Sequence, residues 1–170
     1  MTTKEKDKVE IRKLREANEA HVCAQFMSRS EPWITLGQAY DELLNLANDP
    51  SKERYVAVVA AEVVGFIILD MKGSLVGYIK SIGVLPGWQK KGIGGRLMAF
   101  AEERIFRESP NVFICVSAFN TTARNFYQRL GYEVIGTLKD YLVRGYDELL
   151  LRKTIAPLAA YKKASQSKMT

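Results

Sequence analysis

The segment that most constrains the fold is a strand, a glycine-rich turn, a long helix and a second strand in direct succession. The run LVGYIKSIGV (75–84) has the apolar character of a strand, and apolar residues at helical spacing continue from about Gly92 to Glu108. The continuous apolar run VFICVSA (112–118) then predicts a central strand. A helix that joins two strands of one sheet implies a parallel crossover. We therefore expect one parallel strand pair.

The rest of the chain predicts strands joined by short turns, with two helices near the start. Only two residues separate the first two central strands, which indicates a tight hairpin. Thr35 and Gln38 fit a capping box and predict a helix start. The fold class is α/β: a mixed, mostly antiparallel sheet with one parallel crossover and helices on both faces. The remaining expected elements are strands at 8–15, 54–60, 63–71, 132–138 and 146–153, and helices at 20–27, 35–48 and 121–130.

Length and composition fit a single domain. The chain has 170 residues, of which 47% are hydrophobic. We expect the domain over residues 1–155 and a polar, basic C-terminal tail over 156–170, where three lysines lie. No window approaches the roughly 18–20 apolar residues of a membrane span. The charged N-terminus also lacks the apolar segment of a signal peptide. The expectation is a cytoplasmic protein without a membrane partner.

The few cysteines and histidines argue against several kinds of site. Cys23 and Cys115 are the two cysteines, and neither belongs to a C-x-x-C pair, so a disulfide framework is not expected. His21 is the single histidine, which disfavours a zinc site and a Ser-His-Asp triad. We expect no metal.

Net charge favours a polyanionic partner. The 25 basic and 19 acidic residues leave a formal charge of +6. Part of this excess lies in the C-terminal tail, and no basic stripe marks a nucleic-acid surface. Phosphate on a small cofactor is the simpler explanation, and a nucleic-acid partner is not expected.

The turn in SIGVLPGWQKKGIGGRL (81–97) has the properties of a phosphate cradle. Glycines let an anion approach backbone N–H groups, and the N-terminus of the following helix carries partial positive charge. The alternative is a tight turn that needs glycine for its shape alone. Gly94-Gly95-Arg96 lacks the Gly-Lys-Ser/Thr ending of a P-loop, and Leu97 breaks the dinucleotide-binding pattern. The common nucleotide loops are therefore disfavoured.

Two motifs resemble those of the GNAT (GCN5-related) N-acetyltransferases. The run from Gln89 to Gly94 matches Q/R-x-x-G-x-G/A, the acyl-CoA pyrophosphate loop of that family. The second family motif, N-x-x-A-x-x-x-Y-x-x-x-G-F/Y, follows in the right order. With the element order, the resemblance covers about residues 8–155. The second motif is matched by Asn120, Ala123, Tyr127, Gly131 and Tyr132.

This resemblance implies an enzyme that transfers an acetyl group from acetyl-CoA, as co-substrate, to a primary amine. In the family the pantetheine arm pairs with the strand before the loop, and Tyr127 matches the general acid for the CoA thiolate. Gly83 alternatively marks a bulge in its strand, and Tyr127 alternatively is a buried aromatic. The residues that the resemblance assigns to the cofactor are Ile82, Gly83, Val84, Gln89, Lys90, Lys91, Gly92, Ile93, Gly94, Gly95, Asn120 and Tyr127.

The general base is the least defined part of the site. Many family members carry a glutamate at one of two strand positions, which here are Tyr78 and Cys115. Tyrosine at the first position resembles a branch of protein N-terminal acetyltransferases, in which it relays a proton. Cys115 replaces the histidine that is its partner there. Tyr78 is thus either a catalytic residue or a packing residue of the sheet. An α-amine, with a pKa of about 8 against about 10.4 for lysine, needs less help from a base.

The acceptor is expected to meet Glu31, Trp33 and Tyr141, which supply a carboxylate and aromatic rings for a cation. Each of the three is alternatively an ordinary surface or partly buried residue. The favoured acceptor is a peptide or protein N-terminal amine. The alternatives are a small-molecule amine such as a polyamine, amino acid or aminosugar, a non-catalytic acyl-CoA-binding regulatory module and, least favoured, a nucleic-acid binder. A monomer and a homodimer both remain possible.

Overall fold

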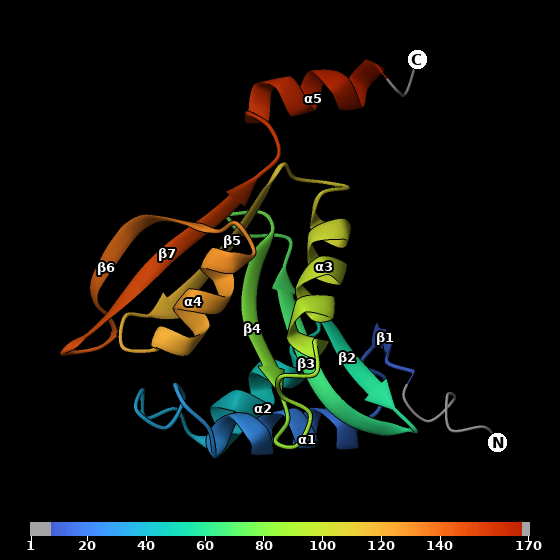
Figure 1. The fold of residues 1–170 in the computed structure, drawn as a ribbon, viewed down its shortest axis with the longest axis vertical. Helices are drawn as coiled ribbons and strands as arrows, with labels where there is room; N and C mark the ends of the chain where they lie inside the picture. Colours follow the sequence, from blue (N-terminus) through green and yellow to red (C-terminus); the bar gives the residue numbers. More distant parts are fainter. Residues whose placement is uncertain (1–7, 168–170) are drawn as a thin grey trace. The chain divides into compact units, whose positions relative to one another are not determined.

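The computed structural model describes residues 8–167 of the chain (Figure 1). Its strands are hydrogen-bonded in the order β1-β2-β3-β4-β5-β7-β6, and β4 pairs with β5 in parallel. The mixed, mostly antiparallel α/β sheet with one parallel crossover is therefore confirmed. The elements are β1 (Glu10–Lys13), α1 (Ala17–Ser28), α2 (Tyr40–Asn48), β2 (Glu53–Val59), β3 (Glu62–Asp70), β4 (Tyr78–Val84), α3 (Ile93–Ile105), β5 (Asn111–Ser117), α4 (Thr121–Arg129), β6 (Glu133–Val143), β7 (Tyr146–Thr154) and α5 (Leu158–Ser167).

Helix α2 begins later than the sequence predicts. It starts at Tyr40, and the carboxylate of Glu42 accepts a hydrogen bond from the backbone N–H of Ala39 at 3.1 Å. The Thr35 N–H instead donates to Oε2 of Glu31 at 3.2 Å, within the turn that precedes the helix. The predicted capping box at Thr35 was wrong. Glutamate side chains accept the backbone N–H groups in question: Glu31 accepts that of Thr35 in the turn, and Glu42 accepts that of Ala39 at the helix start.

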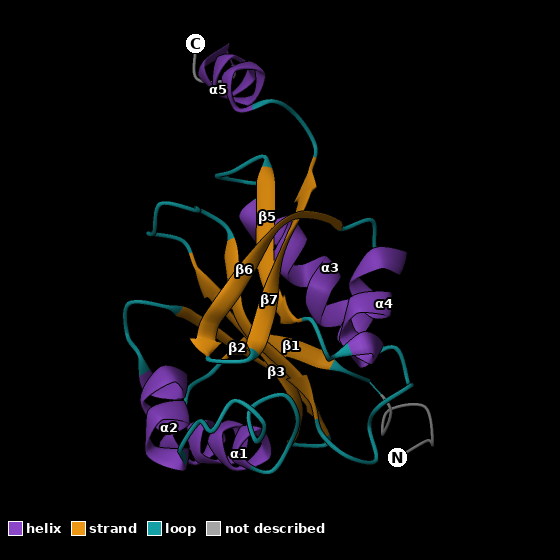
Figure 2. Ribbon diagram, turned by 90° about the vertical axis from the view of Figure 1, so that its left-hand side faces the viewer, coloured by secondary structure: helices purple, strands orange, loops and turns teal. Residues whose placement is uncertain are grey.

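Residues 158–167, in the segment expected to be a polar tail, form helix α5 (Figure 2). The hydroxyl of Tyr161 donates a hydrogen bond to the carbonyl oxygen of Phe106 at 2.7 Å. One aromatic side chain thus ties the start of this helix to the segment after α3. Among the described residues, no helix is long and apolar enough to cross a membrane.

The chain divides into two compact units, which are described separately. The first comprises residues up to 69 together with 80–100, and the second comprises residues 70–79 and 101 onward. Strand β4 and helix α3 each contribute residues to both units.

In the first unit, α1 and α2 lie side by side and bury their apolar faces against β2 and β3 (Figure 1). Small residues of α1 allow this close packing, since Ala20 and Ala24 are fully buried. The buried cluster comprises Ala20, Cys23, Ala24, Met27, Leu43, Ala47, Val56, Val58, Phe66 and Ile68.

Two consecutive residues of β3 show that helices cover both faces of the sheet in this unit. Side chains of Gly65 and Phe66 point to opposite faces because they alternate along a strand. A Cβ on Gly65 would lie 3.2 Å from Leu97 and 3.4 Å from Ile93, both in α3. Phe66 packs edge-on against Phe26 of α1, with ring centroids 5.9 Å apart. The predicted covering of both faces is therefore correct.

In the second unit, β5 pairs antiparallel with β7, which also pairs with β6 to form a long hairpin (Figure 2). Cys115 lies opposite Leu150, and Ser117 lies opposite Glu148. Because registered neighbours share a face, Cys115, Ser117 and Glu148 lie on the same face of this part of the sheet.

A partly buried ion pair fixes the start of the first unit. Nη2 of Arg12 lies 2.6 Å from Oε1 of Glu19, and the backbone N–H groups of Arg15 and Glu16 donate to Oε2 at 2.8 and 3.3 Å. The hydrogen bond from Arg12 is the main reason that the pKa of Glu19 falls to about 2. Glu19 thus anchors β1 to the first turn of α1.

Glu19→Gln should lower the free energy of unfolding by about 1–3 kcal/mol at pH 7, the usual contribution of hydrogen bonds to a charged group. Because the folded-state pKa is depressed, this stability is present above pH 4.5 and is lost as pH falls toward 2. Urea denaturation of both proteins across this range measures the effect. Glu103→Gln, an exposed carboxylate on α3, is the control. Equal loss in both variants would contradict the role of Glu19.

Candidate active site

The turn between β4 and α3 has an unusual backbone, and it lies in the first unit. Gly87, Lys90 and Gly92 all have positive φ angles, of 82°, 61° and 81°. A Cβ on Gly87, Gly92 or Gly95 would meet no heavy atom within 4 Å. These glycines are therefore not required by packing. Because they have no side chain, they leave the backbone of the turn accessible on its open side.

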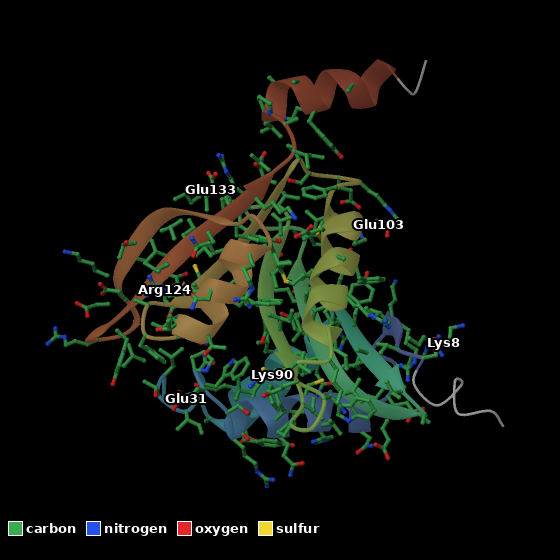
Figure 3. All side chains as sticks on the ribbon, viewed as in Figure 1. Lys8, Glu31, Lys90, Glu103, Arg124 and Glu133 are labelled. Carbon is green, nitrogen blue, oxygen red and sulfur yellow. The ribbon has the colours of Figure 1, made fainter. Side chains whose placement is uncertain are left out.

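The turn also concentrates positive charge at the start of α3. Lys90, Lys91 and Arg96 are exposed, and Nζ of Lys91 lies 4.8 Å from the ring centroid of Trp88 (Lys90 is labelled in Figure 3). The Arg96 N–H donates to the Gly92 carbonyl oxygen at 3.1 Å, which closes the first turn of the helix. The preceding N–H groups have no acceptor within the helix, and the helix dipole adds partial positive charge. An anion is the ligand that this arrangement suits.

Two hydrogen bonds hold the turn against the sheet. Nε2 of Gln89 donates to the carbonyl oxygen of Val84 at 3.1 Å, and the Leu85 N–H donates to that of Val64 at 2.9 Å. Gln89, predicted to bind cofactor, thus also fixes the turn to the end of β4.

Gly83 has a packing role that the sequence did not reveal. A Cβ at this position would lie 2.6 Å from ring atoms of both Phe26 and Phe66. Its neighbours Ile82 and Val84 are half-buried in the same strand. The glycine is therefore needed where two aromatic rings press on β4, whatever ligand approaches the strand.

Asn120 directly precedes α4 and Tyr127 lies in it, both in the second unit. Oδ1 of Asn120 accepts a hydrogen bond from the Ala123 N–H at 3.1 Å, so Asn120 caps the helix. Tyr127 is 6% exposed, and burial raises the pKa of its hydroxyl well above 10. The structure records no hydrogen-bond partner for this hydroxyl among the described residues. Tyr127 is therefore a protonated phenol at neutral pH.

Tyr78, also in the second unit, is hydrogen-bonded to Cys115 on the neighbouring strand. Burial and this hydrogen bond raise the pKa of Tyr78 far above 10, and Tyr141 adds to the effect. A phenolate base at Tyr78 is thus unfavourable at neutral pH. A phenol can still pass a proton along, by accepting one and donating another.

The three residues expected at the acceptor fall in different units. Glu31 is exposed in the turn after α1 (Figure 3), and Trp33 packs edge-on against Phe26 with ring centroids 5.9 Å apart. Tyr141 is 58% exposed on β6. Trp33 is thus partly buried by packing. Tyr141 is exposed, and so is Glu31, whose carboxylate also accepts the Thr35 N–H.

A buried pair that the sequence analysis missed lies on the face of Tyr78 and Cys115. Ser117 is 1% exposed and donates a hydrogen bond to Oε1 of Glu148, which is 3% exposed, at 2.5 Å. The signal available in the sequence was a polar residue at the end of one apolar strand and at the start of another.

The structure shows two surface hollows in the second unit. One, of about 570 Å³, lies along α4 and β6 and is lined by Arg124, Gln128 and Glu133 (Figure 3 labels Arg124 and Glu133). The other, of about 390 Å³, lies at the β6–β7 turn. None of the predicted site residues lines either hollow.

Comparison with known proteins decides the family. The sequence model of the acetyltransferase (GNAT) family matches residues 16–132, which include the turn and the motif on α4. The chain belongs to this family. The fold agrees: a GNAT-family structure from Desulfovibrio desulfuricans superposes with a TM-score of 0.75, covering 88% of this chain and 100% of that chain at 19% identity.

Two curated relatives of this GNAT protein are similar in part of their length. An N-alpha-acetyltransferase from Sulfurisphaera tokodaii is 32% identical over 111 residues, which is 57% of this chain and 66% of that protein. N-alpha-acetyltransferase 50 from Danio rerio is 30% identical over 69 residues, or 39% of this chain and 41% of that protein. The matches thus span from two fifths to about two thirds of these relatives.

The residues of the turn fit the pyrophosphate of acetyl-CoA, the co-substrate of the family. Open backbone, a helix N-terminus and three exposed cations are the groups that bind a diphosphate. Within residues 8–167 the structure shows no group of His, Cys, Asp or Glu side chains that could hold a metal ion.

Gly92→Ala should weaken acetyl-CoA binding at least about tenfold, because a methyl group would stand where phosphate must approach N–H groups. Gly87→Ala is the matched control, since both glycines have positive φ and open surroundings. Titration calorimetry with acetyl-CoA measures both affinities. Equal affinities would show that the turn does not hold the phosphates.

Proposed function

We propose that this protein transfers an acetyl group from acetyl-CoA to the α-amine of a peptide or protein N-terminus. The observation that carries the proposal is the open, positively charged turn before α3, in a chain of the GNAT family. Both curated relatives are N-alpha-acetyltransferases, which supports an α-amine as the acceptor.

The donor supplies a thioester, whose acetyl group passes to the amine. We assign its phosphates to Lys90, Lys91 and the N–H groups of Gly92 to Gly95, and its pantetheine arm to the backbone of Ile82 to Val84. Amide groups of an extended strand can pair with an amide-containing arm as they pair with a strand. The backbone of this segment therefore orients the thioester.

Tyr127 is the proposed acid. Transfer of the acetyl group leaves a thiolate, which leaves more readily if a proton is delivered to its sulfur. The buried hydroxyl of Tyr127 stays protonated at neutral pH, and no protein partner of it is recorded among the described residues. It is thus able to donate to a ligand.

A small cationic amine is the second candidate acceptor. The hollow at the β6–β7 turn combines two carboxylates with two aromatic rings, a set that suits a cation. Phe119 and Tyr146 are 39% and 38% exposed and lie edge to face, with ring centroids 5.4 Å apart. The carboxylates in the lining belong to Asp140 and Asp147.

The deciding experiment measures release of CoA thiol from acetyl-CoA with two acceptor pools. One pool holds short peptides with free N-termini, and the other holds polyamines, amino acids and aminosugars. The proposal predicts turnover with the peptides and none with the same peptides after N-terminal blocking. Turnover with small amines alone would establish the second candidate. Silence from both pools, with acetyl-CoA bound, would indicate a non-catalytic binding module.

Tyr127→Phe should lower kcat about 10²–10⁴-fold, the usual contribution of a positioned acid, with acetyl-CoA affinity preserved. Tyr40→Phe, which removes the hydroxyl of an exposed tyrosine on α2, is the control. Steady-state kinetics and calorimetry give the two readouts. Full activity of the Tyr127 variant would return this residue to a packing role.

A further inference from the structure

Glu148 is a buried carboxylate for which the structure records no cation partner among the described residues. Two other carboxylates of low exposure, with side chains 9% and 15% exposed, have cation partners: Glu19 pairs with Arg12 at 2.6 Å, and Glu102 pairs with Lys153 at 2.7 Å. For Glu148, the hydroxyl of Ser117 is the recorded hydrogen-bond partner within the described part of the chain. Burying an unpaired carboxylate is costly, so packing alone does not explain a glutamate here.

The Ser117–Glu148 pair lies on the sheet face that carries Tyr78 and Cys115. Cys115 and Ser117 are two residues apart on β5, so their side chains point to the same face about 7 Å apart. Tyr78 is hydrogen-bonded to Cys115 on that face. Ser117 also directly precedes the turn to Asn120, whose N–H donates to the Ser117 carbonyl oxygen at 2.9 Å.

The described residues that pair with Glu148 across the sheet carry no positive charge. On its face, β5 supplies Ser117 and Cys115, and the registered residue of β6 is Leu138. The nearest cation on β7 that shares this face is Arg152, two pairs farther along, where it lies opposite Phe113.

Asp147, next to Glu148 in β7, and Tyr141, near Tyr78, are further titratable groups of this region. Asp147 precedes Glu148 and points to the other face, where its Oδ1 accepts from the Asp140 N–H at 3.2 Å. Tyr141 contributes to the raised pKa of Tyr78. Burial raises the pKa of Glu148 above its ordinary value of 4.5, so its carboxylate is a stronger base than an exposed one.

We propose that Glu148 accepts the proton of the acceptor ammonium through the Ser117 hydroxyl, and so replaces the carboxylate that Tyr78 and Cys115 do not supply. This inference rests on the proposed acetyl transfer to an amine. The resemblance led us to expect the base at the position of Tyr78 or of Cys115. Glu148 lies at neither position but on β7, the strand that pairs with the strand of Cys115.

The proton transfer is balanced without any other reactant. An N–H bond of the ammonium breaks, and its proton passes to Oγ of Ser117. The Ser117 hydroxyl proton passes at the same time along the existing hydrogen bond to the carboxylate of Glu148. The products are a neutral amine, an unchanged serine and a carboxylic acid, which returns its proton to solvent after each turnover. The neutral amine then attacks the thioester.

Glu148→Gln keeps the shape of the side chain and removes its basicity, so kcat/KM at pH 7 should fall about 100-fold. The deficit should shrink to less than about tenfold at pH 9.5, because an α-amine with a pKa of about 8 is then neutral without help. The wild-type profile should lose activity as pH falls through the pKa of Glu148, above 4.5, and the variant should lack this limb.

Ser117→Ala tests the relay with the carboxylate intact, and it serves if the Glu148 variant does not fold. It should show the same shrinking deficit as pH rises. Glu103→Gln is the control, because Glu103 is exposed on α3 and its side chain pairs with Arg107 (Figure 3). Thermal denaturation and acetyl-CoA calorimetry establish that each variant is folded and binds its donor.

The outcomes separate this inference from the proposed function. Wild-type turnover with undiminished activity of Glu148→Gln, or a deficit of the same factor at every pH, would overturn the role of Glu148 and leave the proposed function standing. Failure of the wild-type protein to acetylate any amine would overturn both. A deficit that shrinks with rising pH in both variants would support the relay.

Discussion

The backbone of the turn between β4 and α3 is the constraint on which this account depends. Three residues with positive φ and a helix start face open space, so N–H groups and lysine side chains are available to one ligand. Left-handed conformations cost non-glycine residues free energy, and Lys90 adopts one. A chain keeps such a turn where the shape serves a purpose, and binding of a diphosphate accounts for the shape and the charge together.

Two carboxylates of the second unit, Glu102 and Glu148, differ in their hydrogen-bond partners. Glu102 receives hydrogen bonds from Lys153 and Tyr132, at 2.7 and 3.0 Å, and this satisfied cluster ties α3 to the sheet. Glu148 has the Ser117 hydroxyl as its recorded partner, and burial raises the pKa of its carboxyl group, so the carboxylate is a stronger base. The contrast between two carboxylates of one unit separates a residue that stabilises the fold from one that can exchange a proton.

Periodicity and turn chemistry predicted most of the fold, because they act locally. The parallel crossover follows from a helix between two apolar runs, and Asn120 caps α4 as its position before Thr121 indicates. The start of α2 was missed because Glu31 accepts the Thr35 N–H within the preceding turn, while Glu42 accepts the Ala39 N–H at the true helix start. Glu148 was missed for a different reason: alternation along DELLLRK does not reveal which face is buried, and its partner lies 31 residues away in the sequence. The second role of Gly83 likewise depends on two rings that only the folded chain brings to it.

The most direct test compares the affinity of the wild-type protein for acetyl-CoA and for acetyl-pantetheine, which shares the thioester arm and lacks the pyrophosphate. Titration calorimetry at fixed ionic strength measures both. If the turn before α3 holds the phosphates, acetyl-CoA should bind at least about 100-fold more tightly, since several charge-assisted hydrogen bonds are lost with the pyrophosphate. Equal affinities would contradict the assignment of the phosphates to the turn before α3.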